Sequence, residues 1–368
     1  MKQSSISWSV VALALFAGAA AGPSFSNDEP RSLSPGFLAT RPQASLYRSE
    51  DGGATWKAIG LGSLGVNALA IDPVNPSTLY AGTGSGGVFK STDWGETWSA
   101  RSTGLGSLAI NALGIDRAQP STLHAATTGG LFESRDGGTS WSPVGPTLSN
   151  PVFRSVAIDP VVSTTRYAAD AVWVARSVDS GTTWTYSTVG GDSVTSLLVD
   201  PATPSTLYAG VLHATPNGGG VYKSIDGGLR WSFVSGGIIS PTGRYYDVNS
   251  LAIDPAASIV YAGTSGGGVF RSDDAGTSWT AASAGLGTVS VRALAIDPRS
   301  PSTIYSAVDG AGIFKSTDGA KTWTAASAGL DFRLPVALAI DPANSSRVYA
   351  GLRGDLVDAS AARIAARR

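Results

Sequence analysis

A stretch of the form Ser-x-Asp-x-Gly-x-x-Trp occurs seven times in this chain and constrains its fold more than any other feature. The copies end at tryptophans that lie 42 to 48 residues apart, namely Trp56, Trp98, Trp141, Trp184, Trp231, Trp279 and Trp323. In the last copy Ala320 stands in place of the glycine. A period of this length indicates a repeat architecture, in which one small supersecondary unit recurs along the chain.

The repeated stretch is predicted to be a hairpin turn with a structural role. In the copy that ends at Trp98, Asp93 can accept hydrogen bonds from backbone N–H groups of the turn. Gly95 can adopt a positive φ without a steric penalty, and Trp98 is expected to bury its ring against its own repeat. Catalysis would not need seven identical turns, so we interpret their aspartates as structural; these are Asp51, Asp93, Asp136, Asp179, Asp226, Asp274 and Asp318.

A second phrase alternates with these turns. It reads NALAIDPVNPSTLYAGT from Asn67, and six looser copies follow, each with a short apolar strand that ends at an aspartate. Both faces of this strand are apolar or small, which predicts a strand buried on both sides. Each repeat therefore holds four short antiparallel strands, A to D, expected at 68–71, 78–82, 87–91 and 97–100 in the first complete copy.

Four-stranded repeats of this period without helices predict an all-β fold, a seven-bladed β-propeller of four-stranded antiparallel blades. The first recognisable piece, 46–59, contains only strands C and D, and the last, 336–353, contains only strands A and B. We expect the N-terminal C–D strands to pair with the C-terminal A–B strands. This pairing would complete the seventh blade and leave no exposed strand edge at the junction.

The two ends of the chain lie outside the repeats, which we place at 45–353. Residues 1–21 resemble a signal peptide, with Lys2 before a short apolar run and small residues at 19–21. The run is shorter than the roughly 20 residues that span a membrane, so no transmembrane segment is expected. We therefore predict export to the periplasm or the extracellular space, a flexible leader at 22–44, and an Ala/Arg-rich tail at 354–368.

Composition limits the chemistry available to this chain. It has 26 basic and 27 acidic residues, so no electrostatic attraction to nucleic acid is expected. It has no cysteine and only two histidines, which excludes disulfides, thiolate metal sites and a three-histidine metal site. We predict no metal and no cofactor, and we expect a monomer.

The seven Asp turns resemble the Asp-box repeats of bacterial neuraminidases. Similar repeats occur in sialidases, in xyloglucan-cleaving glycoside hydrolases, in sortilin-type receptors and in photosystem II assembly factors. The resemblance covers about residues 45 to 353. It implies a propeller and leaves the function open, because the proteins that share these repeats differ in their chemistry.

The residues that such hydrolases use are incomplete in this sequence. Sialidases carry an Arg-Ile-Pro phrase before the first repeat, and the similar Phe332-Arg333-Leu334-Pro335 follows the last one and is interpreted as a loop between blades. Xyloglucan-cleaving enzymes take one catalytic aspartate from each of two propellers, whereas this chain holds one ring. Hydrolysis needs two facing carboxylates, and nothing marks a pair among Asp170, Asp192, Asp247, Asp309 and Asp331.

Sequence variation gathers in the B–C and D–A loops, which an antiparallel blade places on the face opposite the Asp turns. Two insertions, at 211–220 and between Trp231 and Asp254, are expected to be neighbours there. The candidate binding residues of this face are Arg154, Asp170, Trp173, His213, Asn217, Arg244, Tyr245, Tyr246, Asp247, Arg292, Asp331 and Arg333. Solvated loops without a role are the competing interpretation. Aromatic and arginine side chains on a rigid scaffold favour binding of a protein or carbohydrate.

The sequence therefore favours a ligand-binding or assembly module. A glycoside hydrolase of the xyloglucanase or sialidase kind is the alternative.

Overall fold

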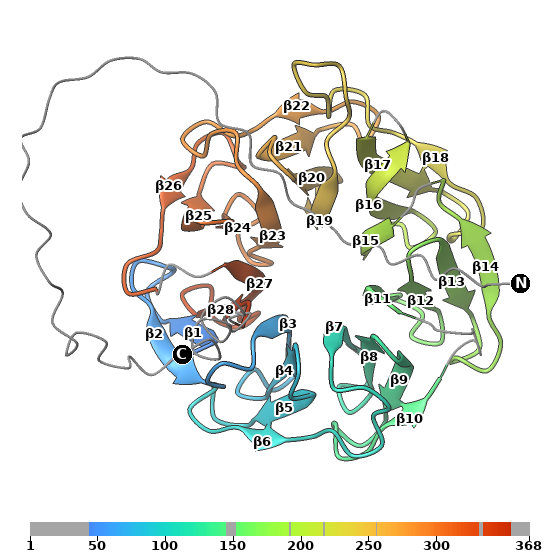
Figure 1. Ribbon diagram of the computed structural model, residues 1–368, viewed down its shortest axis with the longest axis vertical. Helices are drawn as coiled ribbons and strands as arrows, with labels where there is room; N and C mark the ends of the chain where they lie inside the picture. Colours follow the sequence, from blue (N-terminus) through green and yellow to red (C-terminus); the bar gives the residue numbers. More distant parts are fainter. Residues whose placement is uncertain are drawn as a thin grey trace, which may run out of the picture. The chain divides into compact units, whose positions relative to one another are not determined.

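The computed structural model describes residues 44–144, 152–190, 193–215, 218–254, 256–330 and 334–354, without the side chains between 213 and 218. These residues lie in one compact unit. They form strands and no helix, so no described segment is a membrane-spanning helix. Seven four-stranded antiparallel sheets stand around a central axis (Figure 1), which confirms the predicted seven-bladed β-propeller.

We number the blades along the chain and letter their strands from the axis outward. The inner strands contact one another in order around the axis. Blade 1 consists of β3 (Val66–Ile71), β4 (Leu79–Thr83), β5 (Val88–Ser91) and β6 (Ser99–Ala100). Blade 2 consists of β7 (Ile110–Ile115), β8 (Leu123–Thr127), β9 (Gly130–Ser134) and β10 (Ser142–Pro143). Blade 3 consists of β11 (Ser155–Ile158), β12 (Arg166–Ala169), β13 (Trp173–Ser177) and β14 (Thr185–Thr188).

The next three blades repeat this order of strands. Blade 4 consists of β15 (Ser193–Val199), β16 (Leu207–Thr215), β17 (Gly218–Ser224) and β18 (Ser232–Phe233). Blade 5 consists of β19 (Val248–Asp254), β20 (Ile259–Thr264), β21 (Val269–Ser272) and β22 (Thr280–Ala281). Blade 6 consists of β23 (Val291–Ile296), β24 (Ile304–Val308), β25 (Gly312–Ser316) and β26 (Thr324–Ala325).

Blade 7 joins the two ends of the repeat region. Its order is β2-β1-β28-β27, with β27 (Pro335–Ile340) and β28 (Val348–Leu352) from one end and β1 (Leu46–Ser49) and β2 (Lys57–Gly60) from the other. Strand β1 pairs antiparallel with β28 from Leu46 opposite Gly351 to Ser49 opposite Val348. The predicted closure of the ring is therefore confirmed, and both edges at the junction are paired.

Backbone hydrogen bonds define the two faces of the propeller. The Asp turns bond to the A–B turns of their own blades, as Trp94 N–H does to the Ser77 carbonyl at 3.0 Å. We call this side the Asp-turn face. The B–C loops bond to the D–A loops, as Gly84 N–H does to the Leu64 carbonyl at 3.2 Å. We call this opposite side the loop face.

Each Asp turn is held by its own serine and aspartate. Ser91 donates its hydroxyl to Asp93 Oδ1 at 2.7 Å and accepts the Gly95 N–H at 2.8 Å. Thr97 donates its N–H to Oδ1 at 2.9 Å and its hydroxyl to Oδ2 at 2.6 Å. Because these bonds favour the ionised carboxylate, they lower the pKa of Asp93 to about 2. The bonds also occupy Thr97, so strand D begins at Ser99 and is shorter than expected.

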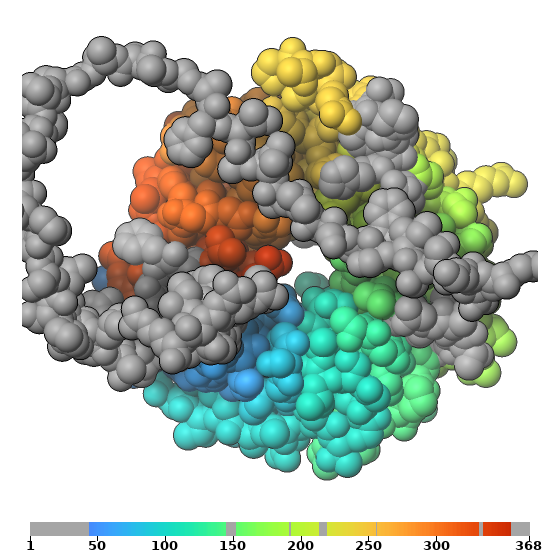
Figure 2. All heavy atoms as spheres, viewed as in Figure 1, coloured from blue at the N-terminus to red at the C-terminus, as the bar shows by residue number. Residues whose placement is uncertain are grey.

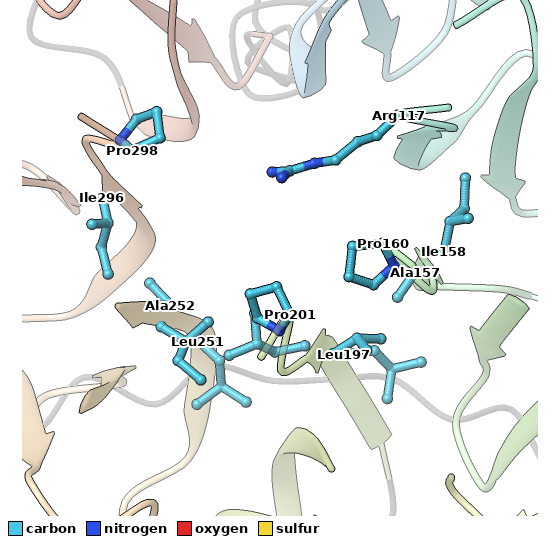
Figure 3. Close-up of a pocket in the computed structure, with 13 residues that line it drawn as sticks. Arg117, Ala157, Ile158, Pro160, Leu197, Pro201, Leu251, Ala252, Ile296 and Pro298 are labelled. Carbon is cyan, nitrogen blue, oxygen red and sulfur yellow. The ribbon is translucent and has the colours of Figure 1, made fainter. Parts of the chain in front are cut away.

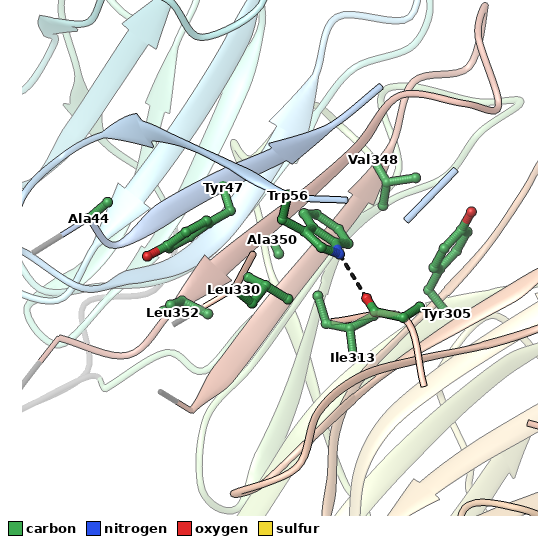
Figure 4. Close-up of a cluster of buried hydrophobic side chains, with 10 residues drawn as sticks. Ala44, Tyr47, Trp56, Tyr305, Ile313, Leu330, Val348, Ala350 and Leu352 are labelled. Atoms are coloured by element: carbon green, nitrogen blue, oxygen red, sulfur yellow. Dashed lines mark hydrogen bonds between the residues drawn. The ribbon is translucent and has the colours of Figure 1, made fainter. Parts of the chain in front are cut away.

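The turn tryptophans bridge neighbouring blades in addition to packing against their own repeat, which is the contact that the sequence predicts. Trp56 of blade 7 donates its indole N–H to the Ala326 carbonyl after blade 6, at 2.7 Å, as the dashed line in Figure 4 marks. Trp141 of blade 2 bonds in the same way to Arg101, after blade 1. Its ring is only 3% exposed. Trp184 differs and bonds to Gly181 within its own turn.

Strand A is not buried on both sides, contrary to the sequence expectation. In β3 the side chains alternate between buried and half-buried, and Asn67, Leu69 and Ile71 form the half-buried set. Of this set, Asn67 and Ile71 each line a cavity, and the space-filling view keeps a gap at the middle of the ring (Figure 2). Seven inner strands enclose a circumference too large for their side chains to fill, so the axis becomes a channel.

The bridging tryptophans should dominate stability. We expect Trp141→Ala to lower the free energy of unfolding by about 3–5 kcal/mol, because it removes a buried ring and an inter-blade hydrogen bond. The control is Trp94→Ala, since Trp94 is 43% exposed and touches Arg347 through a cation–π contact. That change should cost about 1 kcal/mol or less. Equal losses in urea unfolding would contradict the bridging role.

The Asp turns should make the fold sensitive to acid. Six of the seven turn aspartates have pKa values lowered to about 2 by their turn hydrogen bonds; they are Asp51, Asp93, Asp136, Asp179, Asp274 and Asp318. A lowered pKa stabilises the fold above the ordinary carboxyl value near 4, and this contribution is lost as the pH falls through about 2. Urea unfolding between pH 7 and pH 2 should therefore show a falling stability below about pH 4.

Two variants test the cause of this acid sensitivity. Asp93→Asn removes one titrating group and should flatten the dependence of stability on pH. Thr97→Val removes the bonding hydroxyl and should raise the pKa of Asp93 toward its ordinary value, which carboxyl NMR shifts measure. An unchanged pKa of Asp93 in Thr97→Val would refute this assignment.

Candidate functional site

The seven inner strands bring one equivalent position of every repeat to the loop-face end of the channel. This position lies five residues before the aspartate that ends the inner-strand phrase. All seven of these residues line a cavity of about 350 Å³; they are Asn67, Asn111, Arg154, Thr195, Asn249, Arg292 and Val336. Leu212 and Arg353 complete the lining. We call this cavity the loop-face mouth.

The described lining of the loop-face mouth is positively charged. Arg154 and Arg353 are exposed, and neither guanidinium has a hydrogen-bond or ion-pair partner among the residues that the structure describes. Arg292 differs, because its Nε lies 2.6 Å from Asp309 Oδ2. The described lining contains no aspartate or glutamate. Two unpaired guanidiniums at one concave opening provide a site for a carboxylate or another oxyanion.

The asparagines of the mouth join neighbouring blades. Asn67 donates its amide N–H to the Ile110 carbonyl of the next inner strand at 3.0 Å, and Asn111 does the same to Phe153 at 2.7 Å. Asn249 bonds in the same way to Val291 at 2.8 Å. In blade 3, Arg154 occupies the position of these asparagines. It makes no such bond to the next blade, and its side chain is exposed.

The predicted candidates divide between the mouth and the outer part of the loop face. Arg154 and Arg292 line the mouth. Trp173 is 40% exposed at the start of a C strand, and its ring meets Tyr186 edge-on at 6.5 Å. Asp170 is a turn cap, because its Oδ1 accepts the N–H groups of Val172 and Trp173.

The candidate residues of the insertion between Trp231 and Asp254 pack on the outer strands of blades 4 and 5. Tyr245 meets Phe233 of the outermost strand at 4.8 Å, and Tyr246 meets Phe270 at 5.9 Å. Arg244 is exposed at the end of the small hairpin that the insertion forms. Its neighbour Asp247 lies beside the other insertion, since a Cβ on Gly219 would be 2.6 Å from Asp247 Oδ1. The two insertions are therefore neighbours, as predicted.

Several predictions fall on residues outside the described part of the chain. These are the signal peptide at 1–21, the leader at 22–43 and the tail at 355–368. The same holds for Asp192, Asn217, Asp331 and Arg333, and for the side chain of His213. All of these remain predictions.

Sequence reasoning missed most of the mouth. It did not single out Arg353, Thr195, Val336 or the three asparagines. A signal for most of them was present, because all but Arg353 occupy the same position of the inner-strand phrase. Arg353 carries no such signal, since it stands at the end of the last repeat, outside the inner-strand phrase, and reaches the mouth only through closure of the ring.

A buried charged cluster lies between blades 2 and 3, and it is structural. In the other six blades a buried tyrosine occupies the equivalent position of strand B. Tyr305 is an example, and its hydroxyl donates to the Gly52 carbonyl in the next Asp turn at 2.8 Å. A basic C-strand residue, Lys315, donates to the same carbonyl at 2.8 Å. Blade 2 has His124 and Glu133 at these two positions.

Arg166 of blade 3 compensates for both replacements. Its Nη1 lies 2.6 Å from Glu133 Oε1 and donates to the Ser180 carbonyl at 3.1 Å, which is the acceptor that a tyrosine or lysine would otherwise serve. Burial and the nearby Arg166 lower the pKa of His124 to about 3, so the imidazole is neutral. The described residues contain no group of three or more His, Asp or Glu arranged to hold a metal ion.

This cluster predicts strong coupling between its members. Arg166→Leu alone leaves the buried Glu133 with only the exposed Arg135, at 3.0 Å, as an ion-pair partner and should cost up to about 3–5 kcal/mol of unfolding free energy. The triple variant His124→Tyr, Glu133→Lys, Arg166→Leu installs the pattern of the other blades and should recover most of that loss. Additive costs in urea unfolding would show that the three replacements are independent.

Comparison with known proteins identifies the fold and no family. No protein-family model matches the chain, and no curated protein is detectably similar in sequence. An ancestral GH74 enzyme superposes with a TM-score of 0.66 and 20% identity, over 84% of this chain and 45% of its own. The GH74 xyloglucanase from Xanthomonas campestris gives 0.64 and 19%, over 82% and 52%. This chain thus spans about half the length of those two enzymes.

A neighbour of similar size is YCF48 from Cyanidioschyzon merolae, with a TM-score of 0.61 and 16% identity over 81% of this chain and 99% of its own. A structure of YCF48 described as bound to D1 peptide gives 0.57 and 15%, over 85% and 99%. At such identities the similarity concerns the fold alone. The chain is a seven-bladed β-propeller whose structural neighbours include both enzymes and a peptide-bound protein.

Proposed function

We propose that this protein is an exported binding or assembly module that captures a carboxylate-rich segment of another protein at the loop-face mouth. The observation that carries the proposal is the pair of exposed arginines, Arg154 and Arg353, which have no partner among the described residues. Their guanidiniums can each hold a carboxylate through two parallel hydrogen bonds. The propeller supplies the rigid frame, so little flexibility is lost when a ligand binds.

The likeness in fold to a peptide-bound protein supports a binding role. This chain matches YCF48 over 99% of the length of YCF48, which is described as bound to D1 peptide. The outer candidates add an aromatic edge to the same face, with Trp173 against Tyr186 and Tyr245 against Phe233. A peptide that crosses the mouth would meet charge at the centre and aromatic rings at the periphery.

The hydrolase alternative has less support among the described residues. Glycoside hydrolysis requires two carboxylates that face each other across the substrate. Of the loop aspartates considered for this role, Asp309 is paired with Arg292 and Asp170 caps its own turn. No described carboxylate lines the loop-face mouth.

Binding should depend on the two unpaired arginines. We expect a fluorescein-labelled deca-glutamate peptide to bind the protein, and the double variant Arg154→Ala, Arg353→Ala to bind it at least tenfold more weakly, a loss of about 1.4 kcal/mol. Both side chains are exposed, so the melting temperature should change little. Fluorescence anisotropy measures the affinity, which should also fall with added salt.

Matched controls locate the site on the protein. Arg230→Ala with Lys321→Ala removes the same charge from the Asp-turn face, where both residues are exposed, and should leave binding intact. Arg244→Ala with Tyr245→Ala tests the outer part of the loop face and should weaken binding less than the mouth variant does. Polygalacturonate, an acidic glycan, is titrated in parallel. Equal losses in the Asp-turn-face control would refute the proposal, as would release of sugar from xyloglucan by the purified protein.

A further inference from the structure

The opposite end of the channel has a different chemistry. At the Asp-turn face the inner strands end in rings of aliphatic residues and prolines, which enclose a cavity of about 510 Å³. Every described residue that lines it is Ala, Val, Leu, Ile or Pro, with Arg117 as the single exception. A volume of this size lies within the range of small-molecule sites. We call this cavity the Asp-turn-face mouth.

Arg117 interrupts a ring of prolines. In the other six repeats the residue after the inner-strand aspartate is proline, at positions such as Pro160, Pro201 and Pro298. Arg117 lies on the turn between β7 and β8, and its side chain extends into the space between those proline turns (Figure 3). Proline at this position would restrict the unfolded chain and stabilise the fold. The arginine therefore has no local structural advantage over the residue that its equivalents carry.

The Arg117 guanidinium has no ion-pair or hydrogen-bond partner among the described residues. The adjacent Asp116 is buried, and its Oδ1 is engaged by the N–H groups of Ala118 and Gln119. The corresponding aspartates of the neighbouring blades cap their own turns in the same way, as Asp159 does for Val161. Arg117 is exposed within the open cavity, so one accessible cation stands among aliphatic walls and can pair with a ligand that carries one negative charge.

We propose that the Asp-turn-face mouth binds an aliphatic monocarboxylate, such as a medium-chain fatty acid. The carboxylate pairs with Arg117, and the alkyl chain lies against the aliphatic rings that include Ile158, Leu197 and Ile296. These rings succeed one another every two residues along the inner strands, roughly 6–7 Å apart, so an extended chain meets several of them. A methylene chain needs no hydrogen bonds inside the cavity.

A peptide fits this cavity less well than a fatty acid does. The described side chains of the walls offer a peptide backbone no hydrogen-bond partner apart from Arg117, so its other N–H and carbonyl groups would depend on the one-sided edges of the inner strands. The site is also separate from the loop-face mouth, because the two share no lining residue. Failure of either binding proposal therefore leaves the other standing.

The test is calorimetric titration of the intact protein with octanoate, decanoate and dodecanoate below their micelle concentrations. We expect one site per chain and an affinity that rises about fourfold for each added methylene. Decanol keeps the alkyl chain and lacks the charge, so it should bind at least tenfold more weakly than decanoate. An equal affinity for decanol would overturn the pairing with Arg117.

Variants at Arg117 connect the affinity to the residue. Arg117→Pro should bind decanoate at least tenfold more weakly while melting at the same temperature or higher, and Arg117→Gln is the second variant without the charge. Arg117→Lys should recover part of the affinity, and Arg154→Ala at the other mouth should leave it unchanged. Unchanged binding in Arg117→Pro and Arg117→Gln would overturn the proposal. So would tighter binding of a leucine-rich peptide with a free C-terminus, or no binding of any of the three acids.

Discussion

The carboxylate at the centre of each Asp turn is the interaction on which the rest of the propeller depends. Asp93 collects the N–H and hydroxyl of Thr97 and the hydroxyl of Ser91, and so fixes a turn that would otherwise leave these groups without partners. The fixed turn also presents its own backbone carbonyl to the preceding blade. In blade 7, Gly52 O accepts hydrogen bonds from Tyr305 and Lys315 of blade 6. A local turn is thereby converted into a contact between blades.

The same set of contacts recurs between each blade and the next around the ring. The tyrosine and basic residue of one blade bond to the turn of the next, and the tryptophan of that turn bonds back to the first blade. Residues of this pattern can be replaced when another residue compensates. Arg166 compensates in this way for His124 and Glu133, which stand in place of the usual tyrosine and basic residue. At the ring junction the pattern is reinforced by an ion-pair network. Glu50, near the start of the repeat region, binds Arg347 near its end and also Arg48, which in turn binds Glu96 of blade 1. These bonds hold the two ends of the repeat region in a single closed blade.

The symmetry of the repeats makes their exceptions chemically informative. Equivalent side chains form complete rings along the channel, and a ring of neutral residues has little preference for a particular ligand. Arg154 replaces an asparagine in one ring, and Arg117 replaces a proline in another. Arg117 is a cation where the other six blades have proline, and the ring that contains Arg154 has a second arginine, Arg292, which is paired with Asp309. The two ends of one channel thus acquire different surroundings, a polar one on the loop face and an aliphatic one on the Asp-turn face.

The sequence alone determined the number of blades, their four strands, the structural role of the turn aspartates and the closure of the ring. These features follow from short patterns, such as the spacing of the tryptophans and the incomplete repeats at each end. It also placed Arg154 and Arg292 on the loop face, although it could not separate them from Trp173 and Tyr245. The tertiary structure decided which residues meet at the axis, because Arg154 and Arg353 lie far apart in the chain and converge only when the ring closes. It also decided that the tryptophans bond to the neighbouring blade and that the inner strands face a channel. These properties depend on the radial distance between blades, and no pattern within a single repeat encodes that distance.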